Sequence, residues 1–387
     1  MPVEFIGMLG ARDSEGGQGP AVDPGFTRMF ARVHEEAGFD RVLIGHSSSS
    51  PDGGQVAAYV AAHTERLGLL LAHRPGTVAP TMAARTFATL DAFSGGRLAV
   101  HVISGGHDAE QRRDGDYAAK EDRYARTDEF LDVVKRAWTE EEGFGHDGRF
   151  YRFDDFRSEV RPVQHPHIPL YFGGSSPAAY RVGGRHADVF ALWGEPLAET
   201  AGQIAAVHAG ARAAGRTVMP RISVSFRPVL GATEDEAWER AYGILDGLRR
   251  KGTAGGFFDR SRPPLPLGQS VRPENAGSQR LLAVAERGER HDRALWTAPA
   301  AVTGAAGNST ALVGTPETVA RALLDYVDIG VTTFLLRGYR PVRDAEEFGR
   351  SLLPLVRREV GRRETWSART IRCARLLTPA FPRILRR

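Results

Sequence analysis

The chain alternates eight times between a short apolar run and a helical pattern, and this alternation limits the folds that it can adopt. The apolar runs read VEFIGML, RVLIG, LGLLLAH, RLAVHVIS, IPLYFGG, DVFALWG, RISVSFRPVL and TTFLLRGY. They are almost continuously apolar, as expected for parallel strands that are buried on both faces. Eight such units predict an α/β fold of the (β/α)8 TIM-barrel type and leave a doubly wound open sheet as the alternative.

Two observations favour the barrel. A last helical pattern, residues 344–360, follows the eighth run, as barrel closure requires. No G-x-G-x-x-G motif follows the first run, which argues against a dinucleotide-binding open sheet. The helical patterns also carry ordinary boundary signals, such as Gly38 after the first and Thr315 with Pro316 before a late one.

Two segments interrupt the alternation. Residues 147–169 predict a small hairpin with a Pro-rich approach to the fifth strand. Residues 251–309 form a long insertion between the seventh and eighth strands, and we interpret it as a lid that contains one helix, SQRLLAVAERG. We therefore expect a single barrel domain over residues 1–362, and a basic C-terminal extension over residues 363–387.

Composition narrows the cellular setting. No apolar run approaches the ~18 residues that a membrane helix needs, and no basic segment precedes the first apolar stretch, so neither a membrane span nor a secretory signal is expected. Cys373 is the only cysteine, which excludes an internal disulfide and a cysteine-based zinc site and is typical of a cytoplasmic protein. The net charge of +4 arises largely from the C-terminal extension, without the interleaved aromatic residues of a nucleic-acid surface.

Because barrel enzymes build their sites after the carboxyl ends of the strands, the residues found there are the candidates. Gly174, Ser175 and Ser176 precede a helix that begins near Pro177, which suits either a phosphate or anion site or an ordinary helix cap. His107 follows the fourth strand beside carboxylates, but its spacing matches no standard zinc pattern, so no metal is expected.

Two further strands end in unusual residues. Trp193 either lines a binding site or packs in the core. Arg227 lies inside an apolar strand, where an unpaired charge is costly. If it points inward it can bind an anion, and if it points outward it forms a surface pair.

Taken together, the segments RVLIG, HRPGTVAPTMAARTFATLDAFSGGR, HVISGG, EDRYARTDEF, IPLYFGGSS, LWGEP, TALVGTPETVA and RGYRP resemble the bacterial luciferase-like flavin monooxygenases, most closely the alkanesulfonate monooxygenase group. The resemblance covers residues 3–360 and implies a (β/α)8 barrel. It also implies a two-component enzyme, in which a separate NAD(P)H-dependent flavin reductase delivers reduced FMN (FMNH2). The reduced FMN reacts with O2 to a flavin peroxide that oxygenates a small-molecule substrate, and homodimers or homotetramers are common.

The same resemblance implies roles for individual residues. Gly174, Ser175, Ser176 and the Tyr124 hydroxyl would hold the FMN phosphate. His101 and Ser104, at the end of the fourth strand, would lie beside the flavin ring. Trp193 and Tyr339 match aromatic and phenolic positions of the alkanesulfonate site. These assignments are expectations carried over from the family.

Three departures from the alkanesulfonate enzymes bear on the substrate. Ser50 replaces a cysteine, Arg227 replaces a histidine, and Ser225 replaces an arginine. A serine can donate a hydrogen bond but offers no thiolate. An anionic substrate remains consistent with Arg227, and a sulfone, another organosulfur compound or a biosynthetic intermediate is as well supported as a simple alkanesulfonate.

Two other functions stay open on the same barrel. The first is hydride transfer with the deazaflavin F420. The Arg-rich, Lys-poor composition suggests a high-GC genome, and organisms with such genomes often make F420. The second is flavin binding without turnover, which the substitutions at Ser50, His101 and Arg227 would permit.

Overall fold

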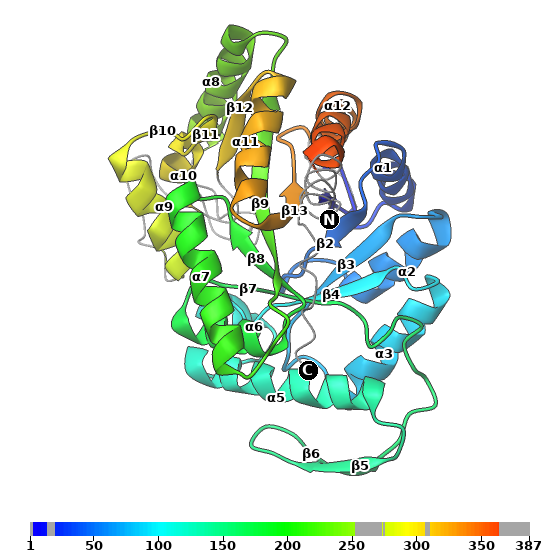
Figure 1. Cartoon of the computed structure of the whole chain (residues 1–387). Coiled ribbons are helices and arrows are strands. Elements are labelled where there is room, and N and C mark those ends of the chain that lie inside the picture. Colours follow the sequence, from blue (N-terminus) through cyan, green and yellow to red (C-terminus); the bar gives the residue numbers. More distant parts are fainter. Residues whose placement is uncertain (1–2, 14–19, 252–272, 274, 306–309, 364–387) are drawn as a thin grey trace, which may run out of the picture.

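Eight parallel strands close into a barrel in the computed structural model, which describes residues 3–13, 20–251, 273, 275–305 and 310–363 (Figure 1). Each strand pairs in parallel with the next around the ring, and β13 pairs with β1 to close it. In spatial order the strands are β1 (Glu4–Leu9), β2 (Arg41–Ile44), β3 (Gly68–His73), β4 (Leu98–Val102), β7 (Leu170–Gly173), β8 (Val189–Trp193), β9 (Arg221–Leu230) and β13 (Val331–Leu336). The eight predicted strands and the barrel are thus confirmed.

Helices surround the barrel between successive strands, as a right-handed crossover requires. They are α1 (Pro24–Glu36), α2 (Gly53–His63), α3 (Pro80–Phe93), α4 (Asp108–Arg113), α5 (Lys120–Thr139), α6 (Pro177–His186), α7 (Leu197–Ala213), α8 (Glu234–Lys251), α11 (Pro316–Asp328), α12 (Pro341–Glu347) and the π-helical turn η1 (Phe348–Leu352), after which residues 353–363 continue as helix.

Local sequence explains where several of these helices begin. The side chains of Asp23, Asp52, Ser176 and Thr315 each accept a hydrogen bond from the backbone N–H three residues later, at the starts of α1, α2, α6 and α11. Such caps satisfy N–H groups that have no partner within the helix. The cap predicted at Thr315 is confirmed.

Alternation along the strands divides the apolar residues between two cores. Outward side chains such as Phe5, Val100 and Phe334 pack against the helices in the main core. Inward side chains form a separate cluster in the lumen, made of Ile6, Leu43, Leu70, Ala99, Tyr171, Val189 and Leu335. The strands are therefore buried on both faces, which is why their sequences are almost continuously apolar.

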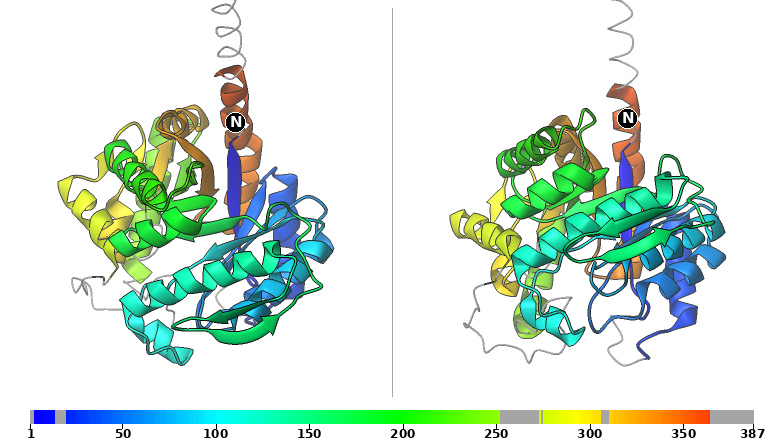
Figure 2. Two further views of the ribbon diagram at one scale, coloured as in Figure 1. Left: turned by 60° about the horizontal axis from the view of Figure 1, so that its bottom comes forward. Right: turned by 90° about the horizontal axis from the view of Figure 1, so that it is seen from below.

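The two predicted interruptions have different structures. At the first interruption a hairpin of β5 (Phe144–Asp147) and β6 (Arg152–Phe156) lies beside α5, and it begins three residues before the predicted segment 147–169 (Figure 2). There, Glu129 of α5 accepts hydrogen bonds from the backbone N–H groups of Phe150 and Tyr151. The hairpin predicted from sequence is confirmed.

The described part of the second interruption folds against one side of the barrel, where the long strand β9 extends beyond the ring (Figure 1). Its predicted helix is present as α9. The four-residue strand β12 was not predicted, because its sequence ALVG is too short to separate from the lead-in to α11. The added elements are α9 (Ala276–Arg287), β10 (Arg290–His291), β11 (Leu295–Trp296), α10 (Ala298–Thr303) and β12 (Ala311–Gly314).

Within the described ranges, no helix combines the length and apolar character that crossing a bilayer requires. The basic extension predicted over residues 363–387 lies, apart from Arg363, outside the described residues.

Candidate functional site

The lumen changes character toward the carboxyl ends of the strands. Two residues beyond the large side chains of the lumen cluster, small residues occupy the inward positions, among them Ala72, Gly173 and Ala191. Most of these inward positions are partly exposed, although the strands around them are buried; Met8, His101, Gly173, Ala191 and Trp193 share this property. Solvent therefore reaches the lumen from this end, where barrel enzymes place their sites.

A cradle of small residues and hydroxyl groups lies after β7. Gly174 has a φ of +150°, and a Cβ built on it would lie 2.6 Å from the Cβ of Ala179, so only glycine fits there. The Ser176 Oγ caps α6 and donates a hydrogen bond to the Oη of Tyr124 at 3.3 Å. The Ser175 Oγ lies 3.5 Å from Oε1 of Gln203. The cradle therefore combines the backbone at Gly174, two serine hydroxyls, the Tyr124 phenol and the N-terminus of α6. Such a set of donors suits a phosphate.

The side chains of His101 and Ser104, near the end of β4, have different surroundings. His101 faces the lumen, and its Nδ1 is buried without a hydrogen-bond partner. Burial lowers the pKa of His101 to about 4, so the imidazole is neutral at ordinary pH. Ser104 is buried, and its Oγ pairs at 3.0 Å with the hydroxyl of Thr127 on α5. Of the two residues, His101 has a buried ring nitrogen with no partner, whereas the hydroxyl hydrogen of Ser104 is engaged by Thr127, which itself donates to the carbonyl of Arg123.

Trp193 ends β8 beneath the start of α9. A Cβ built on Gly277 would lie 3.0 Å from two carbons of the Trp193 ring and 3.4 Å from the Ser175 Oγ. The indole also packs beside the small cluster of Leu281, Ala300 and Ala305. The start of α9 thus lies against both Trp193 and the serine cradle, and the packing predicted for Trp193 is present at the mouth of the barrel.

Arg227 faces inward near the end of β9, as an anion-binding role requires. Its Nη1 donates a hydrogen bond to the carbonyl of Gly338 at 3.1 Å, and its Cζ lies 4.9 Å from the ring centre of Tyr339. Burial is the main cause that lowers the pKa of Arg227. The Oη of Tyr339 is buried without a hydrogen-bond partner, and burial raises the pKa of this phenol.

Ser50 lies on the surface of the loop after β2. Its Oγ donates a hydrogen bond to the carbonyl of Ser47 at 2.9 Å and accepts one from the backbone N–H of Ser47 at 2.9 Å. The hydroxyl is therefore engaged within its own turn, while Asp52 already caps α2. The loop belongs to the carboxyl end of the barrel, but the Ser50 hydroxyl does not meet the other candidates.

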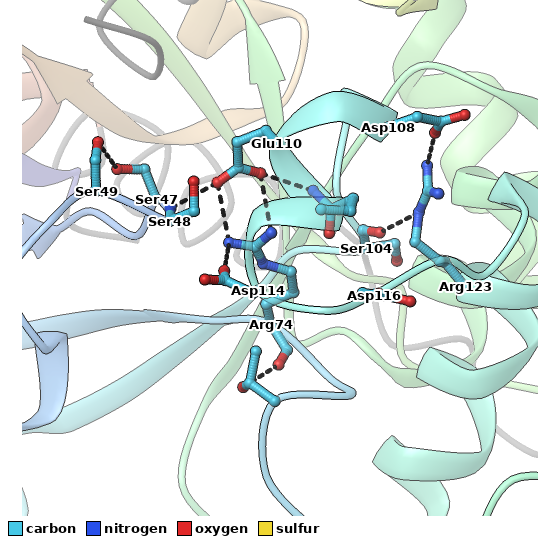
Figure 3. Close-up of polar contacts among 12 residues, drawn as sticks. Ser47, Ser48, Ser49, Arg74, Ser104, Asp108, Glu110, Asp114, Asp116 and Arg123 are labelled. Carbon is cyan, nitrogen blue, oxygen red and sulfur yellow. Dashed lines mark hydrogen bonds and ion pairs between the residues drawn. The ribbon is translucent and has the colours of Figure 1, made fainter. Parts of the chain in front are cut away.

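A buried ionic cluster connects the loops after β2, β3 and β4 (Figure 3). Arg74, only 2% exposed, donates two hydrogen bonds to Glu110, at 2.9 and 3.0 Å, and its Nη2 lies 3.1 Å from Asp114. Glu110 also accepts from the backbone N–H of Ser48 at 2.7 Å and from the amide of Gln111 at 2.7 Å. These bonds fix the serine loop relative to the loop that carries Ser104.

Some buried polar atoms without hydrogen-bond partners belong to residues on elements that meet at this end of the barrel. They are His46 Nε2, Ser48 Oγ, His101 Nδ1, Gln203 Nε2 and Tyr339 Oη. Buried polar groups normally have partners, so each of these atoms is a candidate contact for a polar ligand or water. Within the described ranges, no three His, Cys, Asp or Glu side chains are grouped so as to hold a metal ion.

The structure therefore brings most of the sequence-predicted residues to one mouth, in two groups. Tyr124, Gly174, Ser175 and Ser176 form the cradle, with His101 on the neighbouring strand. Trp193, Arg227 and Tyr339 occupy the β8, β9 and β13 side. Sequence reasoning missed Arg74 and Arg337, and it considered Glu110 only as a possible metal ligand beside His107. Strand alternation would have indicated Arg337, because it lies two residues beyond the inward Leu335.

A family model described as luciferase-like monooxygenase matches residues 3–333. The fold is similar to that of EDTA monooxygenase (EmoA) from Chelativorans sp. BNC1, at a TM-score of 0.73 and 17% identity over 93% of this chain and 94% of that one. Riboflavin lyase (RcaE), solved with modified FMN and riboflavin, gives a TM-score of 0.74 at 22% identity over 93% and 92%. An F420-dependent secondary alcohol dehydrogenase, solved with an F420–acetone adduct, gives a TM-score of 0.66 at 17% identity over 92% of this chain and 99% of that one.

Proposed function

Because the chain belongs to the luciferase-like monooxygenase family, and is an enzyme of that family, we propose that it is a two-component monooxygenase that uses reduced FMN and O2. The substrate is a small organic molecule, with sulfonate- and sulfone-like organosulfur compounds as the first class to test. The observation that carries the proposal is the cradle of Gly174, Ser176 and Tyr124, whose donors suit the phosphate of FMN.

The residues present fit such a cofactor. Ser175, Ser176 and the first N–H groups of α6 would hold the phosphate, and the Tyr124 hydroxyl would add a third type of donor. The neutral His101, with Nδ1 unsatisfied, would hydrogen-bond the polar edge of the ring. Reduced flavin supplies the electrons with which O2 is activated and one oxygen atom is transferred to the substrate.

The protein would then orient the substrate and exclude water. Trp193 offers an apolar wall under α9, and the described part of the insertion rests on it. Arg227 would stabilise negative charge on the substrate or on the reacting oxygen. Water exclusion matters because reduced flavin and O2 otherwise release hydrogen peroxide without oxygenating a substrate.

The test couples the protein to an NAD(P)H-dependent flavin reductase with FMN and O2, and screens organosulfur compounds for sulfite or oxygenated product. We expect at least one compound to give product that depends on the protein, on reductase and on O2. The proposal fails if no compound raises O2 consumption above the peroxide released by reductase and FMN alone.

F420 is the second cofactor to test, because an F420-dependent dehydrogenase shares the fold. A protein that binds F420 more tightly than FMN, and that transfers hydride without consuming O2, would support this alternative. A protein that binds oxidised FMN tightly but turns over no substrate would instead be a flavin-binding protein. Anaerobic titrations with both reduced cofactors separate the three outcomes.

A further inference from the structure

A buried glutamine of α7 contacts the serine cradle from behind. Gln203 is only 2% exposed, and its Oε1 accepts hydrogen bonds from the Ser175 Oγ at 3.5 Å and from the Tyr180 Oη at 3.3 Å. Its Nε2 is also buried and has no hydrogen-bond partner among the residues that the structure describes. The carboxamide oxygen is therefore used twice, whereas the carboxamide nitrogen remains available.

Close packing of α6 on α7 holds Gln203 in this place (Figure 1). A Cβ built on Gly210 of α7 would lie 2.5 Å from the carbonyl oxygen of Tyr180 on α6. Helical side chains lean toward the N-terminus of their helix, so Tyr180 and Gln203 both extend from this contact toward the helix starts at the mouth of the barrel. Gln203 thus reaches Ser175 from a rigid helix and not from a loop.

The Ser175 hydroxyl cannot serve Gln203 and a phosphate in the same way. It has one hydrogen, and a hydrogen that is donated to the Gln203 oxygen is not available to another acceptor. The oxygens of an ionised phosphate are acceptors, and a hydrogen bond to a charged acceptor is roughly twice as strong as one between neutral groups. A phosphate in the cradle therefore draws the Ser175 hydrogen away from Gln203, and the Gln203 oxygen is then left facing another acceptor.

Turning the carboxamide of Gln203 end over end removes this conflict. Its NH2 group then donates to the oxygens of Ser175 and Tyr180, since a hydroxyl can accept as well as donate. One amide atom lacks a partner in either orientation, so the turn adds no unsatisfied group. The two present bonds, at 3.5 and 3.3 Å, are long beside the usual ~2.7–2.8 Å of O–H···O bonds, so little is lost when they are exchanged.

We propose that Gln203 is a positioning residue of the phosphate cradle. Its carboxamide nitrogen donates to the Ser175 Oγ when a phosphate group is bound, and this directs the Ser175 hydrogen to the phosphate. The inference rests on the proposed function, because it takes the cradle as the site of the FMN phosphate. It goes beyond that function by assigning to α7 a residue that contributes to phosphate recognition through Ser175.

Binding of two flavins that differ by the phosphate tests the inference. Reduced FMN and reduced riboflavin are titrated anaerobically into the wild type, Gln203→Met, Gln203→Glu, Ser175→Ala and the double variant Gln203→Met/Ser175→Ala. Methionine neither donates nor accepts in this place, whereas glutamate still accepts from both hydroxyls but cannot donate when ionised. Gln279→Glu is the matched control, because it makes the same change at an exposed side chain of α9. Unchanged riboflavin binding shows that a variant is folded.

We expect Gln203→Met to weaken FMN about fivefold and Gln203→Glu at least tenfold, with riboflavin unchanged. Gln279→Glu should bind both flavins as the wild type does. In the Ser175→Ala background, Gln203→Met should have no further effect on FMN, because Gln203 acts through the Ser175 hydroxyl.

Three outcomes overturn the proposal alone. They are an unchanged FMN affinity in both Gln203 variants, an equal weakening of FMN and riboflavin, and an effect of Gln203→Met that persists in full when Ser175 is alanine. A wild type that binds riboflavin as tightly as FMN refutes the phosphate cradle itself, and the inference with it. The wild-type comparison therefore separates failure of the proposed function from failure of the role of Gln203.

Discussion

Replacing Glu110 by alanine should destabilise the barrel far more than an ordinary surface substitution. Glu110 accepts both hydrogen bonds from Arg74, whose side chain is 2% exposed, and also those from Ser48 and Gln111. Its removal leaves a buried guanidinium with Asp114 as its remaining partner in the cluster. Breaking a buried pair in this way costs about 3–5 kcal/mol, and the retained Asp114 places the expected loss near ~3 kcal/mol.

The matched control is Glu140→Ala at the C-terminal cap of α5. Glu140 accepts a hydrogen bond from Arg136 at 2.6 Å, but the two side chains are 41% and 38% exposed. Such an exposed helical pair contributes only about 0.3–0.5 kcal/mol. Urea unfolding, followed by tryptophan fluorescence with matched refolding curves, gives the free energy of unfolding of each variant.

A second comparison separates lost charge pairing from lost packing. In Arg74→Met/Glu110→Leu the buried guanidinium is removed together with Glu110, and the carboxylate that loses its partner is the more exposed Asp114, so the loss should be smaller than for Glu110→Ala. If Glu110→Ala costs no more than Glu140→Ala, the cluster does not behave as a buried network. The reasoning that it fixes the loops after β2, β3 and β4 would then be wrong.

Three further predictions concern the site. Gly174→Ala should lower the free energy of unfolding by more than Gly215→Ala and should weaken FMN binding. Both glycines have positive φ, but only at Gly174 would the added Cβ meet another atom, the Cβ of Ala179 at 2.6 Å. Urea unfolding and FMN titration measure this, and equal effects of the two variants would contradict it. Tyr339→Phe should change the free energy of unfolding by less than about 1 kcal/mol, because the lost hydroxyl has no partner. The same variant should reduce kcat or raise KM. A large loss of stability would instead show a structural role. The pKa of His101 is about 4 in the folded protein, against an ordinary value of 6.5, so the unfolded chain binds the proton first as the pH drops. The free energy of unfolding should therefore fall between pH 6.5 and pH 4. His101→Gln should make this fall shallower, and an unchanged slope would refute the assignment.

The barrel could be predicted because parallel strands buried on both faces give apolar runs with regular spacing. The same rhythm located the mouth and therefore Gly174, Ser176 and Trp193. The hairpin of β5 and β6 was also visible, since the segment DGRFYRFDDF interrupts the strand-and-helix alternation ahead of a Pro-rich approach. Fold and mouth thus followed from local patterns, without knowledge of tertiary contacts.

Contacts between distant loops could not be predicted in the same way. The partners Arg74 and Glu110 lie 36 residues apart on two different loops, and each alone resembles a solvated charge. Ser50 illustrates a different limit, because the resemblance predicts its hydroxyl in the site, whereas the local turn that bonds this hydroxyl to Ser47 could not be predicted from the serine run. Strand alternation did contain the signal for Arg337, but its charge resembled the beginning of a loop.

The central claim is that the cradle after β7 binds the phosphate of reduced FMN, and anaerobic binding of cofactors tests it most directly. Reduced FMN, reduced riboflavin and reduced F420 are titrated into the wild type and into Tyr124→Phe, which removes one phosphate donor but leaves the Ser176 cap of α6 intact. We predict that the wild type prefers reduced FMN to both other cofactors. Tyr124→Phe should weaken FMN about tenfold and leave riboflavin unchanged. Tighter binding of F420, or equal weakening of FMN and riboflavin, would contradict the account.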